Sequence, residues 1–170
     1  MDKIKTLIDE KTLEKRIEEL AMQIEKDYEG KELVFLGILK GSVMFMTELA
    51  KKIKSNVEFE FMEVSSYSGT ESTGRIKVSK DIRDSIEGKD VIIVEDIIDT
   101  GRTLTYLVEY LKNKKPNSLK IATMLSKEAR REKFVKVDYI GFEIEDKFVI
   151  GYGLDYDEKY RNLHYIGYIE

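Results

Sequence analysis

Apolar residues along this chain follow two spacings, one typical of helices and one typical of buried strands. In the segment 12–28 they recur every three or four residues, which predicts an amphipathic helix that stops at Gly30. The segment 33–38 is a continuous apolar run, typical of a strand covered on both faces. The further expected elements are a helix carrying Met46, Leu49 and Ile53, strands at 57–64, 76–78, 91–94, 119–125, 137–140 and 148–150, and a helix at 103–112.

Strands that alternate with helices indicate a fold class. We expect an α/β fold with an open, mostly parallel twisted sheet and helices on both faces. Ligands of such sheets bind beyond the carboxyl ends of the strands. The chain of 170 residues shows no linker, repeat or low-complexity tract, so we expect a single domain over 1–170.

Composition excludes several classes of function. A net charge of −4 argues against general nucleic-acid binding, which needs a basic surface. The absence of cysteine excludes disulfides, thiolate nucleophiles and zinc–thiolate sites. The single histidine, His164, cannot form a histidine metal cluster and is interpreted as structural. No apolar run approaches the length of about 18 residues that a membrane helix needs, and the N-terminus lacks a hydrophobic signal core. We therefore expect a cytoplasmic protein with no nucleic-acid or membrane partner.

The most informative segment is 91–103. Four β-branched apolar residues predict a buried strand, and Glu95 and Asp96 follow where that strand is expected to end. Asp99 and the turn Thr100-Gly101-Arg102-Thr103 then open a helix. Helix N-termini bind phosphate, and adjacent carboxylates bind hydroxyls or magnesium, so the segment predicts a phosphate site beside a diol or a divalent metal. The simpler alternative is a capped helix, with Asp99 or Thr100 as N-cap and the two acids as loop solubilisers.

This segment resembles, residue for residue, the phosphoribosyl pyrophosphate (PRPP) signature of the type I phosphoribosyltransferases. The resemblance covers nearly the whole chain and narrows to the 6-oxopurine branch, the hypoxanthine-guanine phosphoribosyltransferases. It implies the type I phosphoribosyltransferase fold, with a core at about 30–145 and a small hood from about 1–12 and 146–170. It also implies a homodimer or homotetramer.

The same resemblance implies a reaction of purine salvage. The 5-phosphoribosyl group of PRPP is transferred to hypoxanthine or guanine, with xanthine also open, to give IMP or GMP and pyrophosphate. Glu95 and Asp96 would hold the ribose hydroxyls, directly or through Mg²⁺. Asp99, Thr100, Gly101, Arg102 and Thr103 would hold the 5-phosphate. Asp99 would also be the catalytic general base, accepting a proton from N7 of the purine as N9 attacks.

Two further motifs support the resemblance on the donor side. Leu39-Lys40-Gly41-Ser42 resembles the family's pyrophosphate loop, whose first peptide bond is cis, so Lys40 and Gly41 would bind pyrophosphate. Ser66 and Tyr67 lie in a polar run that resembles the lid over the reacting centre. The lid would exclude water from the sugar intermediate.

A third group of residues resembles the base-binding region. Lys127 matches the lysine that donates to the purine oxygen at position 6, which disfavours adenine. Phe148 would stack on the purine, and the main chain at Val149 and Asp155 would read its edge. Asp155 would reach a second magnesium, and Arg161 would bind pyrophosphate through its planar fork of donors. Without the resemblance, Lys127 and Arg161 would be interpreted as surface charges and Phe148 as core.

Two alternatives stay open at this point. Regulators that bind PRPP with little catalysis share the signature, although they typically carry a nucleic-acid-binding domain or a basic face. Orotate and adenine phosphoribosyltransferases also share it, but should lack the combination of Lys127 with the segment 148–155. Ser126 and Glu128-Ala129 differ from the more usual bacterial residues, which leaves the preference among the three 6-oxopurines open.

Overall fold

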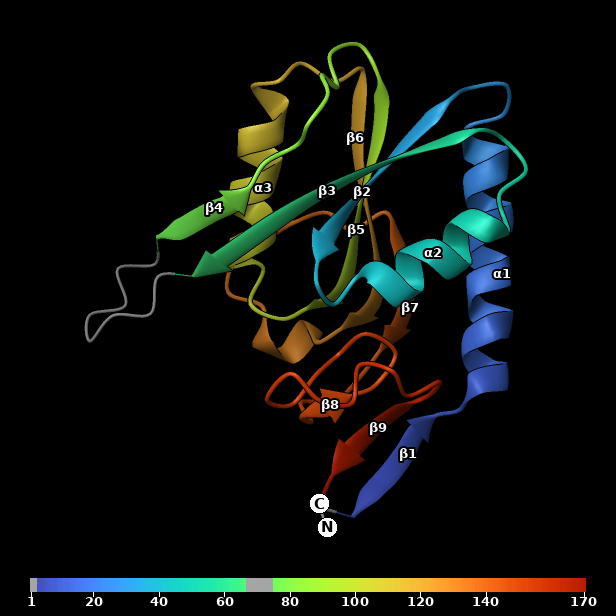
Figure 1. Cartoon of the computed structure of the whole chain (residues 1–170), viewed down its shortest axis with the longest axis vertical. Coiled ribbons are helices and arrows are strands. Elements are labelled where there is room, and N and C mark those ends of the chain that lie inside the picture. Colours follow the sequence, from blue (N-terminus) through green and yellow to red (C-terminus); the bar gives the residue numbers. More distant parts are fainter. Residues whose placement is uncertain (1–2, 67–74) are drawn as a thin grey trace.

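The computed structural model describes residues 3–66 and 75–170, and its main element is a six-stranded mixed sheet. The strand order is β4-β3-β2-β5-β6-β7, with β4 antiparallel at one edge and the other strands parallel (Figure 1). The strands are β2 (Leu33–Leu39), β3 (Val57–Ser66), β4 (Ile76–Lys80), β5 (Asp90–Ile98), β6 (Ser118–Ser126) and β7 (Tyr139–Glu143). The expected α/β class is confirmed.

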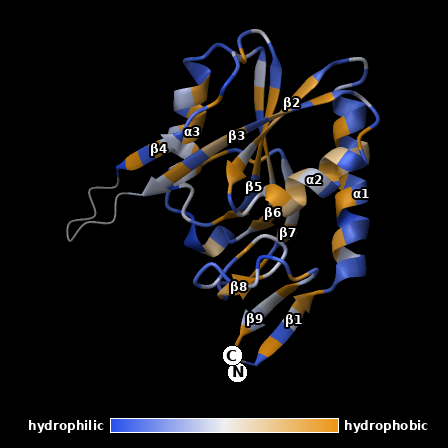
Figure 2. Ribbon diagram, in the orientation of Figure 1, coloured by the Kyte–Doolittle hydropathy of each residue, from blue (hydrophilic) through white to orange (hydrophobic). Residues whose placement is uncertain are grey.

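Helices cover both faces of this sheet. Ile92 and Val94 of β5 pack in one apolar cluster with α1 (Glu10–Asp27) and α2 (Val43–Lys51). Val91 and Ile93 point to the other face and pack with α3 (Arg102–Lys112). Burial on both sides explains why the central strands are largely hydrophobic in Figure 2, without polar alternation.

The two ends of the described chain meet in a second, three-stranded antiparallel sheet. Its order is β1-β9-β8, formed by β1 (Ile4–Ile8), β8 (Val149–Ile150) and β9 (Ile166–Ile169). It lies at one end of the molecule, beyond the large sheet (Figure 1). β1 and β9 were not expected from the sequence, because each is short and its register depends on a partner at the far end of the chain, with Ile4 opposite Ile169.

Strand β5 continues further than the apolar run predicts. We expected it to end at Val94, but it extends to Ile98. The cause is asymmetric pairing: β5 pairs with β2 only as far as Val94, opposite Gly37, whereas it pairs with β6 as far as Ile98. Glu95 and Asp96 therefore lie inside β5, at the point where its neighbour β2 turns away.

Two other boundaries differ from the expected ones for local reasons. Helix α1 begins at Glu10 rather than at 12, because the carboxylate of Asp9 accepts the N–H of Thr12 at 2.8 Å and caps it. Strand β7 occupies 139–143 rather than 137–140, because it pairs with β6 from Tyr139, opposite Ala122, to Glu143, opposite Ser126. Among the described residues, no helix is both long and apolar enough to cross a membrane.

Candidate active site

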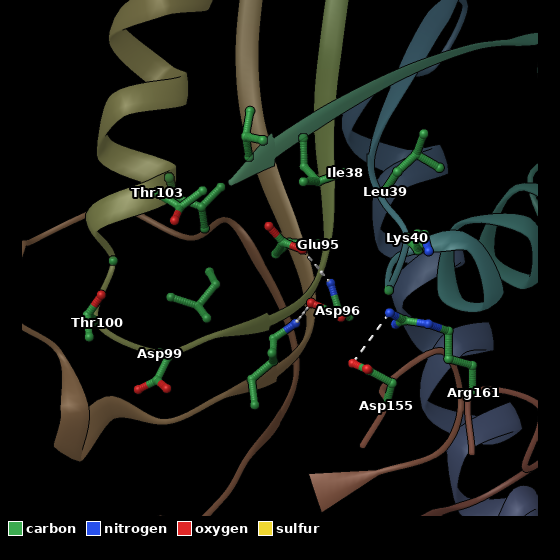
Figure 3. A pocket seen from close by; sticks show the side chains of 16 residues that line it. Ile38, Leu39, Lys40, Glu95, Asp96, Asp99, Thr100, Thr103, Asp155 and Arg161 are labelled. Carbon is green, nitrogen blue, oxygen red and sulfur yellow. Dashed lines mark hydrogen bonds and ion pairs between the residues drawn. The ribbon is translucent and has the colours of Figure 1, made fainter. Parts of the chain in front are cut away.

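A pocket of about 330 Å³ opens where β2 and β5 end and α3 begins. In Figure 3, Thr100 and Thr103 lie on one side of Glu95 and Asp96, and Lys40 and Arg161 lie on the other. The structure thus gathers most of the residues expected to bind PRPP. The predicted residues that line the pocket are Lys40, Gly41, Glu95, Asp96, Asp99, Thr100, Gly101, Thr103, Asp155 and Arg161.

The two adjacent carboxylates are not loop solubilisers, so that part of the simpler alternative is wrong. Glu95 is only 8% exposed, and its Oε1 accepts the N–H of Asp96 at 3.1 Å. Burial, reinforced by repulsion from Asp96, raises the pKa of Glu95 well above its usual value. Burial also raises the pKa of Asp96. A bound divalent cation would relieve this repulsion, so the pair fits a hard, oxygen-seeking metal ion.

The third predicted metal ligand, Asp155, lies apart from this pair. Its carboxylate is 3.4 Å from Nη2 of Arg161 and accepts the N–H of Glu158 at 2.9 Å. Within residues 3–66 and 75–170, no three acidic, histidine or cysteine side chains form a group that could hold a metal. The three predicted metal ligands therefore lie at two separate places in the pocket, Glu95 and Asp96 at one and Asp155 at the other. Magnesium commonly takes one or two protein carboxylates and completes its shell with water and substrate phosphate.

The loop after β2 approaches this pair closely. The peptide bond between Leu39 and Lys40 is cis, as the resemblance implies. At Gly41, an added Cβ would overlap the carboxylate of Asp96, so only glycine lets the loop pass this close. Gly153 in turn lies against the carbonyl of Gly41. The backbone of Gly41 is thus held between Asp96 and the segment that carries Asp155 and Arg161.

The turn before α3 contains a left-handed glycine. Gly101 adopts φ +83° and is the N-cap residue, so the alternative with Asp99 or Thr100 as N-cap is wrong. The N–H groups of Glu132 and Lys133 donate to the carbonyl of Thr100 at 2.8 and 3.0 Å and support the turn from behind. Arg102 does not line the pocket; its side chain is exposed and pairs with Glu132.

Asp99 has a cationic neighbour that the sequence did not indicate. Nε of Arg130 lies 2.8 Å from Oδ1 of Asp99, and Nε of Arg131 donates to the Asp99 carbonyl at 3.2 Å. Arg130 ends the short 3₁₀ helix η1 (Glu128–Arg130), which the sequence presented only as a charged turn. Its contact with Asp99 depends on how that turn folds back toward β5.

Of the residues expected to bind the purine, Asp155 lines this pocket, whereas Lys127, Phe148 and Val149 do not. Lys127 is only 7% exposed, so its interpretation as a surface charge is wrong. Its Nζ is 3.4 Å from Asp146, whose other carboxylate oxygen is 3.5 Å from Nη1 of Arg130. An ionic chain, Lys127–Asp146–Arg130–Asp99, therefore connects the expected base-reading lysine to the expected general base.

Two of the remaining predicted site residues, Phe148 and Val149, belong to the hood segment 146–170. Phe148 is 57% exposed and meets Tyr156 edge to face at 5.6 Å, so its interpretation as core is wrong. The side chain of Val149 is buried in β8. Ser66 is the last residue of β3, and Tyr67 lies outside the described residues.

Comparisons with known proteins agree with this geometry. The family model described as phosphoribosyl transferase domain matches residues 3–157. The chain is 52% identical over 162 residues to a hypoxanthine-guanine phosphoribosyltransferase of Staphylococcus aureus, covering 95% of this chain and 90% of that protein. It is also 49% identical over 167 residues to the bifunctional protein TilS/HprT of Listeria innocua. That match covers 98% of this chain but only 26% of the Listeria protein, so the chain spans about a quarter of that relative's length.

Solved structures of similar proteins share the whole fold. A hypoxanthine-guanine phosphoribosyltransferase of Bacillus anthracis superimposes with a TM-score of 0.92 at 45% identity, over 99% of both chains. A hypoxanthine phosphoribosyl transferase of Trypanosoma cruzi gives a TM-score of 0.92 at 40% identity, over 98% of this chain and 91% of that one. By its matched domain and by these relatives, the chain belongs to the phosphoribosyl transferase family, in its hypoxanthine-guanine branch.

Proposed function

We propose that this chain transfers the 5-phosphoribosyl group of PRPP to hypoxanthine or guanine, giving IMP or GMP and pyrophosphate. One observation carries the proposal: in a single pocket, the glycine turn at the N-terminus of α3 and a pair of cationic side chains lie on opposite sides of two carboxylates. PRPP has the complementary arrangement, since phosphate and pyrophosphate flank a ribose with two hydroxyls. Xanthine is a further candidate base.

Each part of the donor has residues suited to it. The 5-phosphate would bind at Thr100, Gly101 and Thr103, where the N–H groups of the first turn of α3 favour an anion. Arg102 would contribute there through its backbone, because its side chain is engaged by Glu132. Glu95 and Asp96 would hold the ribose hydroxyls.

The pyrophosphate group would bind at Lys40, Arg161 and the backbone of Gly41. Arg161 is positioned by its own contacts, since Nη1 donates to the carbonyl of Gly153 at 2.7 Å. Magnesium, held by Glu95 and Asp96 and in a second position by Asp155, would neutralise the charge of the leaving group. These cations stabilise the charge that develops on pyrophosphate as the glycosidic bond breaks.

The purine would approach from the side of Asp99. Asp99 would accept the proton from N7 while N9 forms the bond to the sugar, and Nε of its neighbour Arg130 lies 2.8 Å from one carboxylate oxygen. Lys127 would donate to the oxygen at position 6, Phe148 would stack on the ring, and the main chain at Val149 and Asp155 would read the purine edge. Closure of a lid that includes Ser66 and Tyr67 would exclude water from the reacting sugar.

Assembly as a homodimer or homotetramer belongs to the same proposal. The similar Trypanosoma cruzi structure concerns the role of the C-terminal region in oligomeric state and enzymatic activity. A regulator that binds PRPP without turnover is the less favoured alternative. Binding of PRPP alone would not require a cation beside Asp99 or a buried Lys127.

The direct test is turnover with magnesium, PRPP and one base at a time. Guanine and hypoxanthine should be converted to nucleotide, and adenine should be disfavoured by about 10⁴-fold, because Lys127 would face an amino group instead of an oxygen. Orotate tests the orotate phosphoribosyltransferase alternative, and xanthine tests the preference among the 6-oxopurines. Binding of PRPP without turnover of any base would contradict the enzyme and support the regulator.

Replacing Lys127 by alanine should lower kcat/KM for guanine about 10- to 100-fold, since one charge-assisted hydrogen bond to the base is lost. The dissociation constant of PRPP should stay within about twofold, because Lys127 does not line the donor pocket. Steady-state kinetics with guanine and calorimetry with PRPP measure the two effects separately. Lys136→Ala, at a lysine that lies mostly in solvent, is the control for loss of one charge. Equal losses for donor and base would rule out the base-reading role.

A further inference from the structure

The two cations assigned to pyrophosphate already share an anion, the side chain of Glu158. Nζ of Lys40 donates to Oε2 of Glu158 at 2.9 Å, and Nη2 of Arg161 donates to Oε1 at 3.2 Å. Each carboxylate oxygen therefore binds a different cation, although Lys40 and Glu158 are 118 positions apart in the sequence. A carboxylate that bridges two cations in this way occupies their donors as a pyrophosphate group would.

The local backbone presents Glu158 in this position. Asp157 and Glu158 are both left-handed, with φ +53° and +62°, and a pair of 3.0 Å hydrogen bonds between Tyr156 and Lys159 closes the turn. The N–H of Glu158 also donates to Oδ2 of Asp155 at 2.9 Å. The carboxylate thus comes from a tight turn anchored on a residue of the pocket.

The electrostatics of Glu158 follow from these contacts. Hydrogen bonds from Lys40 and then Arg161 hold the pKa of Glu158 below its usual value, so the group is an anion at neutral pH. Among the described residues, Nε of Arg161 is buried and has no hydrogen-bond partner.

We propose that Glu158 is an internal competitor of pyrophosphate: it pairs with Lys40 and Arg161 and must leave them when the donor binds. The inference rests on the proposed function, which assigns these two cations to pyrophosphate. Its consequence is that Glu158 weakens the binding of the pyrophosphate group and favours its release after transfer. The residue acts through Lys40 and Arg161 and is a determinant of affinity rather than a catalytic group.

The expected effect is moderate. The side chains of Glu158 and Lys40 are 63% and 56% exposed, and ion pairs in solvent contribute little to stability. Glu158→Gln keeps the size of the side chain and removes its charge. The dissociation constant of inorganic pyrophosphate, measured by calorimetry with magnesium, should fall about three- to tenfold. The inhibition constant of pyrophosphate against PRPP should fall by the same factor.

A matched control is available in the same turn. Asp157→Asn removes one charge next to Glu158, and asparagine tolerates the left-handed backbone. Within the described part of the chain Asp157 makes no ion pair with Lys40 or Arg161. This variant should change pyrophosphate affinity less than about twofold, because a lone exposed charge is screened by solvent and salt.

The outcomes separate this inference from the proposed function. Unchanged or weaker pyrophosphate binding in Glu158→Gln would overturn the inference, since it would mean that Glu158 only orients the two cations. Equal gains in both variants would also overturn it, because net charge would then explain them. A wild-type chain that turns over no base would instead overturn the proposed function, whatever the two variants do.

Discussion

Replacing Asp99 by asparagine should lower kcat about 10²–10⁴-fold, the usual contribution of a positioned general base. Asparagine has the same shape as aspartate but cannot accept the proton from N7 of the purine. Binding of PRPP should change little, because the phosphate turn is held from behind by the N–H groups of Glu132 and Lys133. The ion pair with Arg130 is lost, yet both side chains are nearly half exposed, so the free energy of unfolding should fall by at most about 1 kcal/mol.

The measurement is kcat at saturating guanine and PRPP, together with urea unfolding of the same preparation. Asp157→Asn serves as a control, because it makes the same chemical change at an exposed residue outside the pocket. If Asp99→Asn turned over guanine as fast as the wild type, another group would have to be the base. A loss of folding in that variant would show that Asp99 has a structural role that its contacts do not indicate.

Gly41→Ala should weaken PRPP binding and lower kcat/KM by about 10²-fold or more. An added Cβ would overlap the carboxylate of Asp96, so either the loop or the carboxylate must shift. Displacements of about 1 Å near a reacting centre can cost a factor of this size. The loss should appear in every assay that involves the donor, since Asp96 and the backbone of Gly41 both serve PRPP.

The control for a glycine substitution as such is Gly30→Ala. Gly30 has φ +72° and no atom near an added Cβ, so alanine there should cost about 1 kcal/mol of stability through backbone strain and leave kinetics unchanged. Gly41→Ala should therefore lose PRPP affinity and activity, whereas Gly30→Ala should lose only stability. Calorimetric titration with PRPP and thermal unfolding measure both. Wild-type donor affinity in Gly41→Ala would contradict the close approach of the loop to Asp96.

The parts of the site that the sequence predicted are those built from consecutive residues. The turn before α3 and the buried strand of β5 depend on local chemistry, and the cis peptide before Lys40 was implied by the resemblance of its four-residue motif. The predicted end of β5 was wrong because its true end depends on which neighbour continues beside it. Glu95 thus appeared to lie in a loop, although it is buried inside a strand.

The contacts that the sequence did not predict join distant segments through charged side chains. Arg130 contacts Asp99, Asp146 bridges Arg130 and Lys127, and Glu158 bridges Lys40 and Arg161. Charged residues in turns are usually solvated, so their type and spacing carry no signal of such pairing. Only the fold, which brings β2, β5 and the hood to one pocket, reveals these partners.

We propose that one pocket binds both anionic ends of PRPP and places Asp99 beside the incoming base. A crystal structure with GMP, magnesium and pyrophosphate tests it most directly. We expect the 5-phosphate at residues 100–103, the ribose hydroxyls at Glu95 and Asp96, pyrophosphate at Lys40 and Arg161, and N7 of guanine within hydrogen-bonding distance of Asp99. Nucleotide bound away from the segment 95–103 would contradict it.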